Sequence, residues 1–211
     1  MSRPLRGGHP PVTPFEEKTE PRRATPGIPR ERLVGVRQRE QDALSWFFET
    51  YFDRIYSWAY RLIGERTAAE DVVQEVFLRV HHGAPTLDPD RDPWPWLLTI
   101  TYNTCRDLWR SNRTRRSADT LSLDDYPADA GVEGNQSTPE REVSVRERER
   151  LVQSAILELQ ETPRAVVLLR DYHGLPHDEV AKIVGLSPAA TRKCYSRALI
   201  ALGKRLEVVL G

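Results

Sequence analysis

The feature that most constrains this chain is a series of helix signals between residues 162 and 206, in which glycines separate one predicted helix from the next. Two Thr/Ser-Pro pairs supply N-cap and first-turn residues, and two glycines stand where helices would end. These signals are Thr162-Pro163, Gly174, Gly185 and Ser187-Pro188. A short helix, a tight turn and a longer basic helix predict a helix-turn-helix, whose second helix enters a DNA major groove.

The residues on these helices agree with that prediction. The apolar seam between the two helices consists of Val180, Ile183, Val184 and Leu186. The last helix is basic and carries Arg192, Lys193, Arg197, Lys204 and Arg205. An ordinary helical hairpin with a solvated basic face would also carry such charges, but turn chemistry and charge together favour DNA binding.

Length and composition indicate a helical chain with real cores. The 211 residues allow one or two domains, and 39% of them are hydrophobic. No apolar run approaches the roughly 18 residues that span a bilayer, and the start, MSRPLRGGHPPV, lacks the apolar segment of a signal peptide. Cys105 and Cys194 lie far apart within helical patterns and are predicted to be buried thiols. We therefore expect a cytoplasmic protein without membrane insertion.

Charge is distributed unevenly, although the formal net charge is zero. Residues 1–41 hold nine Lys/Arg against five Asp/Glu and are rich in proline, which predicts a disordered basic tail. Residues 117–144 hold seven acids against one arginine and are rich in Pro, Gly and Ser, which predicts a flexible acidic linker. Two helical modules remain, 42–116 and 145–211. We expect an all-α fold of two small domains joined by this linker.

The first module opens with an amphipathic helix predicted for residues 42–63, which Gly64 ends. Its apolar positions are Leu44, Phe47, Phe48, Tyr51, Phe52, Ile55, Tyr56, Ala59, Leu62 and Ile63. Thr67 and Glu70 are spaced as a capping box before a second helix, AAEDVVQEVFLRV. The polar stripe of that helix is either a solvated face or a docking surface for a partner helix, and composition does not decide between them.

A third helix is predicted after Asp92-Pro93, and it mixes aromatic residues with arginines. The mixture comprises Trp94, Trp96, Tyr102, Trp109, Asn103, Arg106, Arg110, Arg113, Arg115 and Arg116. Aromatic rings stack on unpaired bases and arginines bind phosphates, which favours a nucleic-acid face. The pattern also fits a core with arginines on the solvated side, its apolar positions being Trp96, Leu97, Ile100, Thr104 and Leu108. We expect the two interpretations to apply to different residues.

Three segments in this order carry a family resemblance: AAEDVVQEVFLRV, WLLTITYNTCRDLWRSNRTRR and LLRDYHGLPHDEVAKIVGLS. Together they resemble the conserved regions of ECF (group 4) sigma factors of the sigma-70 family. The resemblance implies an alternative sigma factor, a non-enzymatic protein that binds bacterial core RNA polymerase and directs promoter-specific transcription initiation. It assigns residues 42–116 to sigma region 2 and residues 145–211 to sigma region 4.

The resemblance also assigns residues to three binding surfaces. Those implied to dock on the clamp coiled coil of polymerase are Asp71, Gln74, Glu75 and Leu78. Those implied to melt the minus-ten element and hold a flipped base are Trp96, Ile100, Asn103, Arg106, Arg110, Arg115 and Arg116. Those implied to read the minus-thirty-five element are Ser187, Thr191, Arg192, Lys193 and Arg197. Extruding a base costs a few kcal/mol, which stacking and hydrogen bonds to the base edge offset.

The recognition helix departs from the family's usual start, Gly-Thr-Val-Lys/Arg-Ser-Arg, at two positions. Ala190 replaces the threonine and Cys194 replaces the final arginine, whereas Arg192 keeps the basic residue. These departures leave open which upstream sequence the helix reads. A linker of the predicted length reaches at most about 90–100 Å and averages about 30 Å as a coil. Two DNA sites one to three helical turns apart are therefore within reach of the two modules.

Two other classes of function compete with this prediction. A free-standing helix-turn-helix regulator would not need the ordered motifs of residues 68–116, and co-purification with core polymerase separates the two. A metal enzyme would have to use His81, His82, His173 and His177, which lie at turns without a Cys or acid cluster at ligand spacing. We expect no metal and no cofactor. An anti-sigma partner is common in the resembling family, but the sequence identifies none.

Overall fold

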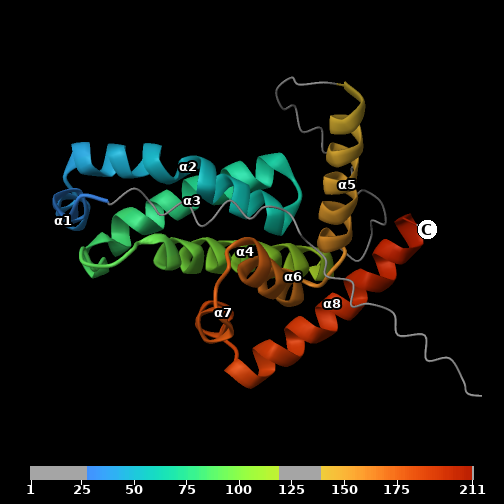
Figure 1. Ribbon diagram of the computed structural model, residues 1–211. Helices are drawn as coiled ribbons and strands as arrows, with labels where there is room; N and C mark the ends of the chain where they lie inside the picture. Colours follow the sequence, from blue (N-terminus) through green and yellow to red (C-terminus); the bar gives the residue numbers. More distant parts are fainter. Residues whose placement is uncertain (1–27, 119–138, 211) are drawn as a thin grey trace, which may run out of the picture.

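The computed structural model describes residues 28–118 and 139–210, and all regular structure within these ranges is helical (Figure 1). The first part contains α1 (Arg30–Gln38), α2 (Gln41–Ile63), α3 (Arg66–Gly83), the 3-10 turn η1 (Ala84–Thr86) and α4 (Trp94–Ala118). The second contains α5 (Pro139–Leu157), α6 (Glu161–Val167), the π-helical turn η2 (Leu168–Tyr172), α7 (His177–Val184) and α8 (Pro188–Leu210). The predicted all-α class is confirmed.

Helix α1 corrects the prediction of a disordered tail for residues 30–41. Its apolar side chains Leu33 and Val36 are buried, because α1 packs against α2. Arg39 ends the helix in the left-handed region and donates from its side chain to the carbonyl oxygens of His81 and His82, at 3.0 and 3.1 Å. The upstream prolines hid this short helix from sequence reasoning. Residues 1–27 of the predicted tail lie outside the described residues.

The predicted start of α3 is wrong by a few residues. The N-cap is Glu65, whose carboxylate accepts from the backbone N–H groups of Thr67 and Ala68, both at 2.8 Å. Thr67 and Glu70 therefore lie inside the helix and form no capping box. The start of α4 agrees with the prediction, since the Asp92 carboxylate accepts from the Trp94 N–H at 2.9 Å.

The predicted linker is too long at both ends. Helix α4 continues to Ala118, and α5 begins at Pro139, six residues before the predicted second module. Pro139 at the first helical position and the acids that follow it are start signals that the charged composition obscured. The rest of the predicted linker, residues 119–138, lies outside the described residues.

The helix-turn-helix is confirmed, and it is preceded by a π-helical turn that the sequence did not predict. Helix α6, which precedes the helix-turn-helix pair α7 and α8, begins at Glu161. Thr162-Pro163 therefore lies in its first turn and does not cap it. The helix then widens into η2, where the His173 N–H donates to the carbonyl oxygen of Leu168 at 3.1 Å. Gly185 ends α7 with φ of 74°, a left-handed conformation that favours glycine.

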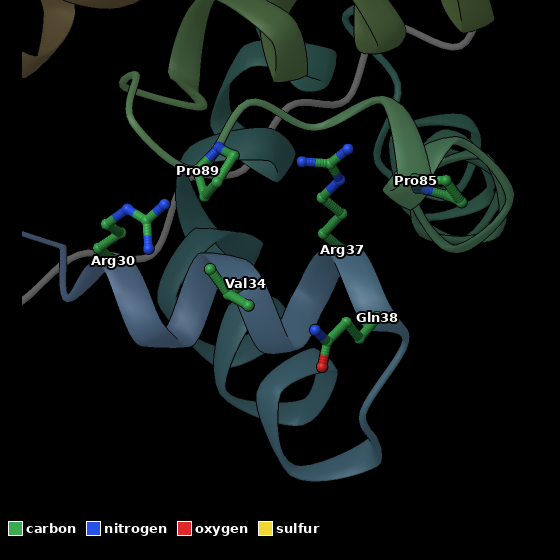
Figure 2. Close-up of a pocket in the computed structure, with 6 residues that line it drawn as sticks. All are labelled: Arg30, Val34, Arg37, Gln38, Pro85 and Pro89. Atoms are coloured by element: carbon green, nitrogen blue, oxygen red, sulfur yellow. The ribbon is translucent and has the colours of Figure 1, made fainter.

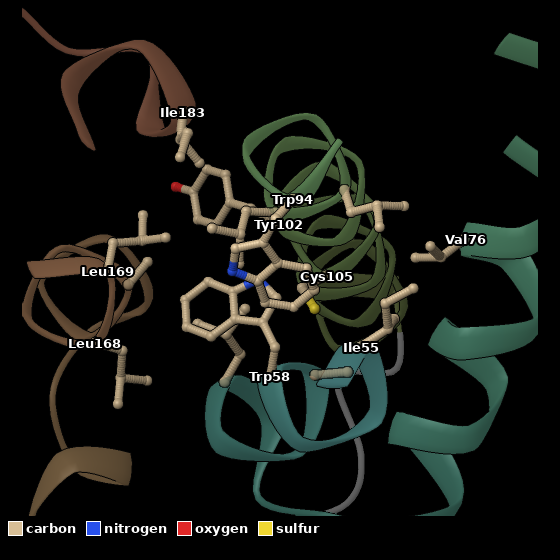
Figure 3. Packing of buried hydrophobic residues seen from close by; sticks show 14 of the residues in the cluster. Ile55, Trp58, Val76, Trp94, Tyr102, Cys105, Leu168, Leu169 and Ile183 are labelled. Atoms are coloured by element: carbon tan, nitrogen blue, oxygen red, sulfur yellow. The ribbon is translucent and has the colours of Figure 1, made fainter. Parts of the chain in front are cut away.

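The two modules pack directly on each other. Helix α4 contacts α7, and α2 contacts both α5 and α6. One hydrophobic cluster holds residues from both modules, and those labelled in Figure 3 include Trp58, Trp94, Tyr102, Leu168, Leu169 and Ile183. The structure is therefore closed, whereas the predicted linker suggested two separated heads. No helix in the described ranges is long and apolar enough to cross a membrane.

Candidate partner-binding and nucleic-acid-binding surfaces

The outward face of α3 presents four of the predicted residues on one side of the helix, since they are spaced three and four apart. Asp71, Gln74 and Leu78 are exposed, and Glu75 is partly buried. The Leu78 side chain is the apolar one of the set, and the residue is 58% exposed. The opposite face, formed by Val72, Val73, Val76 and Val80, is buried against the core. The structure thus brings the predicted docking residues together.

Glu75 also has a structural task. Its carboxylate accepts from Arg79 at 2.7 Å, and Arg79 donates at 3.0 Å to Asp107 on α4. These hydrogen bonds raise the pKa of Arg79 above its usual value, Glu75 being the largest cause. The network links α3 to α4. A charge reversal at Glu75 would disturb that link, so Gln74 and Leu78 are better probes of docking.

An aromatic surface beside this face was not predicted. Phe52 was assigned to the apolar side of its helix, but it is 46% exposed. Its ring lies 6.3 Å from that of Phe77 and 6.5 Å from that of Tyr56. The apolar stripe of α2 is wider than the core it covers, which is why helical spacing alone placed Phe52 inside.

A shallow pocket of about 450 Å³ lies between α1 and the loop that precedes α4 (Figure 2). Its lining residues are Arg30, Val34, Arg37, Gln38, Pro85 and Pro89. Arg30 is paired with Asp90 at 2.6 Å, and both side chains are more than half exposed. The sequence offered no signal for this pocket, because α1 itself was not predicted.

Helix α4 divides its predicted DNA residues between two environments. Arg110 is exposed, whereas Asn103, Trp96 and Ile100 are all half-buried, and Trp96 and Ile100 pack on the core. Trp96 lies against Gly83 at the end of α3. The core interpretation of this helix therefore holds for Trp96 and Ile100, and the nucleic-acid face stays a prediction. Arg115 and Arg116 lie on the last turns of α4, but their side chains are outside the described part of the structure.

Two aromatic residues of α4 are not available for base stacking in this closed structure. Trp94 is 8% exposed and Tyr102 is 2% exposed, so of the aromatic residues in this pattern these two belong to the core. Burial raises the pKa of Tyr102, and Thr162 on α6, which lies near its side chain, offsets part of that rise. Arg106, one turn along the same side, is partly buried, and its Nε has no hydrogen-bond partner among the described residues.

The start of α8 is organised by Ser187. Its hydroxyl accepts from the Ala190 N–H at 3.2 Å, and its carbonyl accepts from the Thr191 hydroxyl at 3.0 Å. Thr191 is fully buried, which corrects its assignment to DNA contact. The predicted basic residues Arg192, Lys193 and Arg197 are all exposed on this helix.

Tyr195 joins α8 to η2 and to the start of α7. Its hydroxyl donates to Asp171 at 2.7 Å, and its ring packs edge-on against His177. Burial and the bond to Asp171 raise the pKa of Tyr195 to about 12. Burial also raises the pKa of Asp171. Within the described ranges, no three His, Cys, Asp or Glu residues are grouped so as to hold a metal ion.

Sequence comparison places both modules in one family. Residues 47–115 match Sigma-70 region 2, and residues 149–202 match Sigma-70, region 4. The ECF RNA polymerase sigma factor SigW of Bacillus subtilis is 28% identical over 84% of this chain and 96% of its own. The RNA polymerase sigma factor CnrH of Cupriavidus metallidurans is 32% identical over 67% of this chain and 74% of its own. The chain belongs to the ECF sigma factors of the sigma-70 family.

Solved structures have the same fold. CnrH, determined in complex with the cytosolic domain of CnrY, matches with a TM-score of 0.58 and 23% identity over 85% of this chain and 97% of that one. The sigma factor RpoE of Bartonella quintana, in complex with the anti-sigma factor NepR, matches with a TM-score of 0.60 and 18% identity over 78% and 96%.

Proposed function

We propose that this chain binds core RNA polymerase through the outward face of α3 and directs the enzyme to its promoters. The observation that carries the docking surface is Leu78, a 58% exposed aliphatic residue between the polar side chains of α3. Apolar side chains on an otherwise polar helix face are typical of protein interfaces. Asp71 and Gln74 lie on the same face, and both are exposed. A free-standing regulator would have no use for this face.

Substitution of Leu78 tests the docking surface. We expect Leu78→Glu to leave the thermal melting temperature unchanged and to weaken core-polymerase binding at least about tenfold, because a buried interface centre would receive a charge. Ile200→Glu is the matched control, since Ile200 on α8 is 61% exposed and receives the same chemical change. Equal core affinity of the two folded variants would remove Leu78 from the docking surface.

The outer side of α4 is proposed to hold the minus-ten strand. Arg110 is exposed there and Asn103 is partly exposed, and an asparagine amide both donates to and accepts from a base edge. Trp96 and Ile100 pack on the core and present only part of their surface, so we assign them to supporting this side. Arg115 and Arg116 remain candidates for the phosphate path along the end of the helix.

Helix α8 is proposed to read the minus-thirty-five element. Arg192 lies near the helix N-terminus, where recognition helices contact base edges, and Lys193 and Arg197 are exposed beside it. The Ser187 hydroxyl is used as a cap, which supports a positioning role more than a phosphate contact. Thr191 has no part in this proposal.

These surfaces suggest which part of the chain acts as each sigma region. Residues 42–116 are proposed to act as sigma region 2, extended by α1, and residues 145–211 as sigma region 4, extended to Pro139. The chain would supply recognition and strand capture, while polymerase supplies the chemistry. Its place of action would be the cytoplasm, where core polymerase and promoter DNA are found. An anti-sigma factor is a candidate partner, since RpoE of Bartonella quintana was solved with one.

A further inference from the structure

The shallow pocket between α1 and the loop that precedes α4 has no part in the proposed docking and DNA-binding surfaces (Figure 2). Its α1 wall lies outside the part of the chain that matches Sigma-70 region 2. Arg30, Val34 and Arg37 are spaced four and three residues apart, so they share the side of α1 that faces the loop. Pro85 and Pro89 supply the opposite wall. The pocket therefore joins two segments that lie far apart in the sequence.

The two walls of this pocket are held in place by bonds within the chain. Arg39, at the end of α1, donates to two carbonyl oxygens in the last turn of α3, at 3.0 and 3.1 Å. Arg30 is paired with Asp90 of the loop at 2.6 Å. The Asp88 carboxylate accepts from the Asp90 N–H at 3.0 Å, which fixes the turn of the loop. A site whose walls are already positioned binds a ligand without a large cost of ordering.

The pocket carries positive charge that the chain does not neutralise. Arg37 is exposed, and its side chain has no hydrogen bond or ion pair to any described residue. Arg30 is already paired with Asp90, and no Asp or Glu is among the described residues that line the pocket. The planar donors of a guanidinium match two oxygens of a phosphate. Arg37 is therefore suited to bind an anionic group that enters the pocket.

The rest of the lining is suited to a planar, largely apolar body. Val34, Pro85 and Pro89 present apolar surface, and the Gln38 amide beside them both donates and accepts, as a base edge requires. The volume of about 450 Å³ lies within the roughly 300–1,000 Å³ of small-ligand sites. An anion, an apolar ring and a mixed hydrogen-bonding edge together describe a nucleotide. An acidic peptide would use the arginine but not the apolar wall.

The place of the pocket favours a nucleotide of a DNA strand over a free nucleotide. The loop leads directly into α4, the helix proposed to hold the minus-ten strand. Sites for free small molecules enclose most of the ligand, whereas a shallow pocket lets a strand enter and leave. We propose that this pocket binds one further nucleotide of the melted promoter strand, outside the minus-ten element, with a phosphate on Arg37 and the base against Pro85 and Pro89. This assignment rests on the proposed function, because it needs the strand that α4 holds.

The first test uses the chain assembled with core polymerase and two fluorescent single strands of a promoter that the complex transcribes. The shorter strand covers the non-template minus-ten element, and the longer one extends it on both sides. Arg37→Ala should weaken binding of the longer strand about tenfold, because a charged hydrogen bond is lost, and should leave the shorter strand unaffected. Thermal melting checks that each variant is folded.

Arg66→Ala is the matched control. Arg66 is also exposed, and the whole length of α3 separates it from the pocket, so the variant loses the same charge elsewhere. A loss confined to Arg37→Ala and to the longer strand supports the site. Equal losses in the two alanine variants, or an equal loss of both strands in Arg37→Ala, overturn it.

An abasic scan of the longer strand tests whether a base enters the pocket. Removing the base at one position outside the minus-ten element should weaken binding by the wild type. The same removal should have little further effect in Val34→Glu, because a carboxylate in the pocket has already expelled the nucleotide, and contacts at one site are not additive. Additive losses at every position would overturn capture of a base.

Two other probes separate the alternative occupants of the pocket. Deoxynucleoside monophosphates that bind the wild type but not Arg37→Ala, while strand binding is unchanged, would identify a free-nucleotide site and overturn strand capture. A polyglutamate peptide with the same behaviour would identify an acidic protein partner and also overturn it. In both cases the DNA role of α4 stands. If the complex binds neither strand more tightly than core polymerase alone, that role fails, and the pocket proposal fails with it.

Discussion

Acidification should separate the two helical modules, because it protonates His173 at the contact between them. Burial, with smaller contributions from Arg54 and Arg61, lowers the pKa of this imidazole from its usual 6.5 to about 3 in the closed structure. Trp58 and Trp94 face it from α2 and α4 and carry no charge. In the open chain the ring is free to titrate near its usual pKa. The closed state therefore binds the proton less well than the open one, and its stability falls as pH falls below about 6.5.

The size of this effect follows from the two pKa values. Between about pH 7.5 and about pH 5, the ratio of closed to open chain should fall about 30-fold, or about 2 kcal/mol. This figure depends mainly on the open-state pKa, since any closed-state pKa well below 5 gives nearly the same result.

Energy transfer between the two modules, measured across this pH range at constant ionic strength, is the appropriate assay. His173→Gln is the control, because glutamine cannot take up a proton while Asp171 still titrates. We expect a steep loss of transfer in the wild type and a much flatter curve in the glutamine variant. Parallel curves for the two proteins would refute the role of His173 in closure.

Four further predictions concern the DNA-binding helices and the cap of α8. Asn103→Ala should reduce open-complex formation, seen by permanganate footprinting, while the affinity for duplex promoter DNA stays near wild type. Arg110→Ala should instead lower the affinity for DNA of every sequence and reduce the slope of log affinity against log salt concentration by about one. If Arg192 reads a guanine, Arg192→Ala should cost about 1–3 kcal/mol of DNA-binding free energy and relax the sequence preference at one upstream base pair. Identical logos of the sequences selected by the wild type and the variant would exclude base reading. Ser187→Ala should cost about 1 kcal/mol in denaturant unfolding, and no loss would remove the cap.

The corrections made by the structure share a cause. Phe52 was assigned to the core because it recurs at helical spacing, yet helical spacing does not say how wide the covering partner is. Thr191 was assigned to DNA because it occupies the family's recognition helix, yet its side chain turns inward onto the Ser187 carbonyl. Tyr102 belongs to a pattern of aromatics beside arginines that favoured a nucleic-acid face, yet its side chain is buried. In each case the residue type was read correctly, and the neighbour that decides its exposure was not visible in the sequence.

What the sequence determined by itself is local. Helix ends at Gly64 and Gly185, the start at Asp92 and the order of the helices follow from capping and turn chemistry, which act over a few residues. What only the tertiary structure decided is the π turn before His173, the place of that ring between two tryptophans and the packing of the second module on the first. These depend on contacts between residues far apart in the chain, such as Trp58 and His173. These contacts are stabilised by apolar burial and close packing, which the local sequence does not predict.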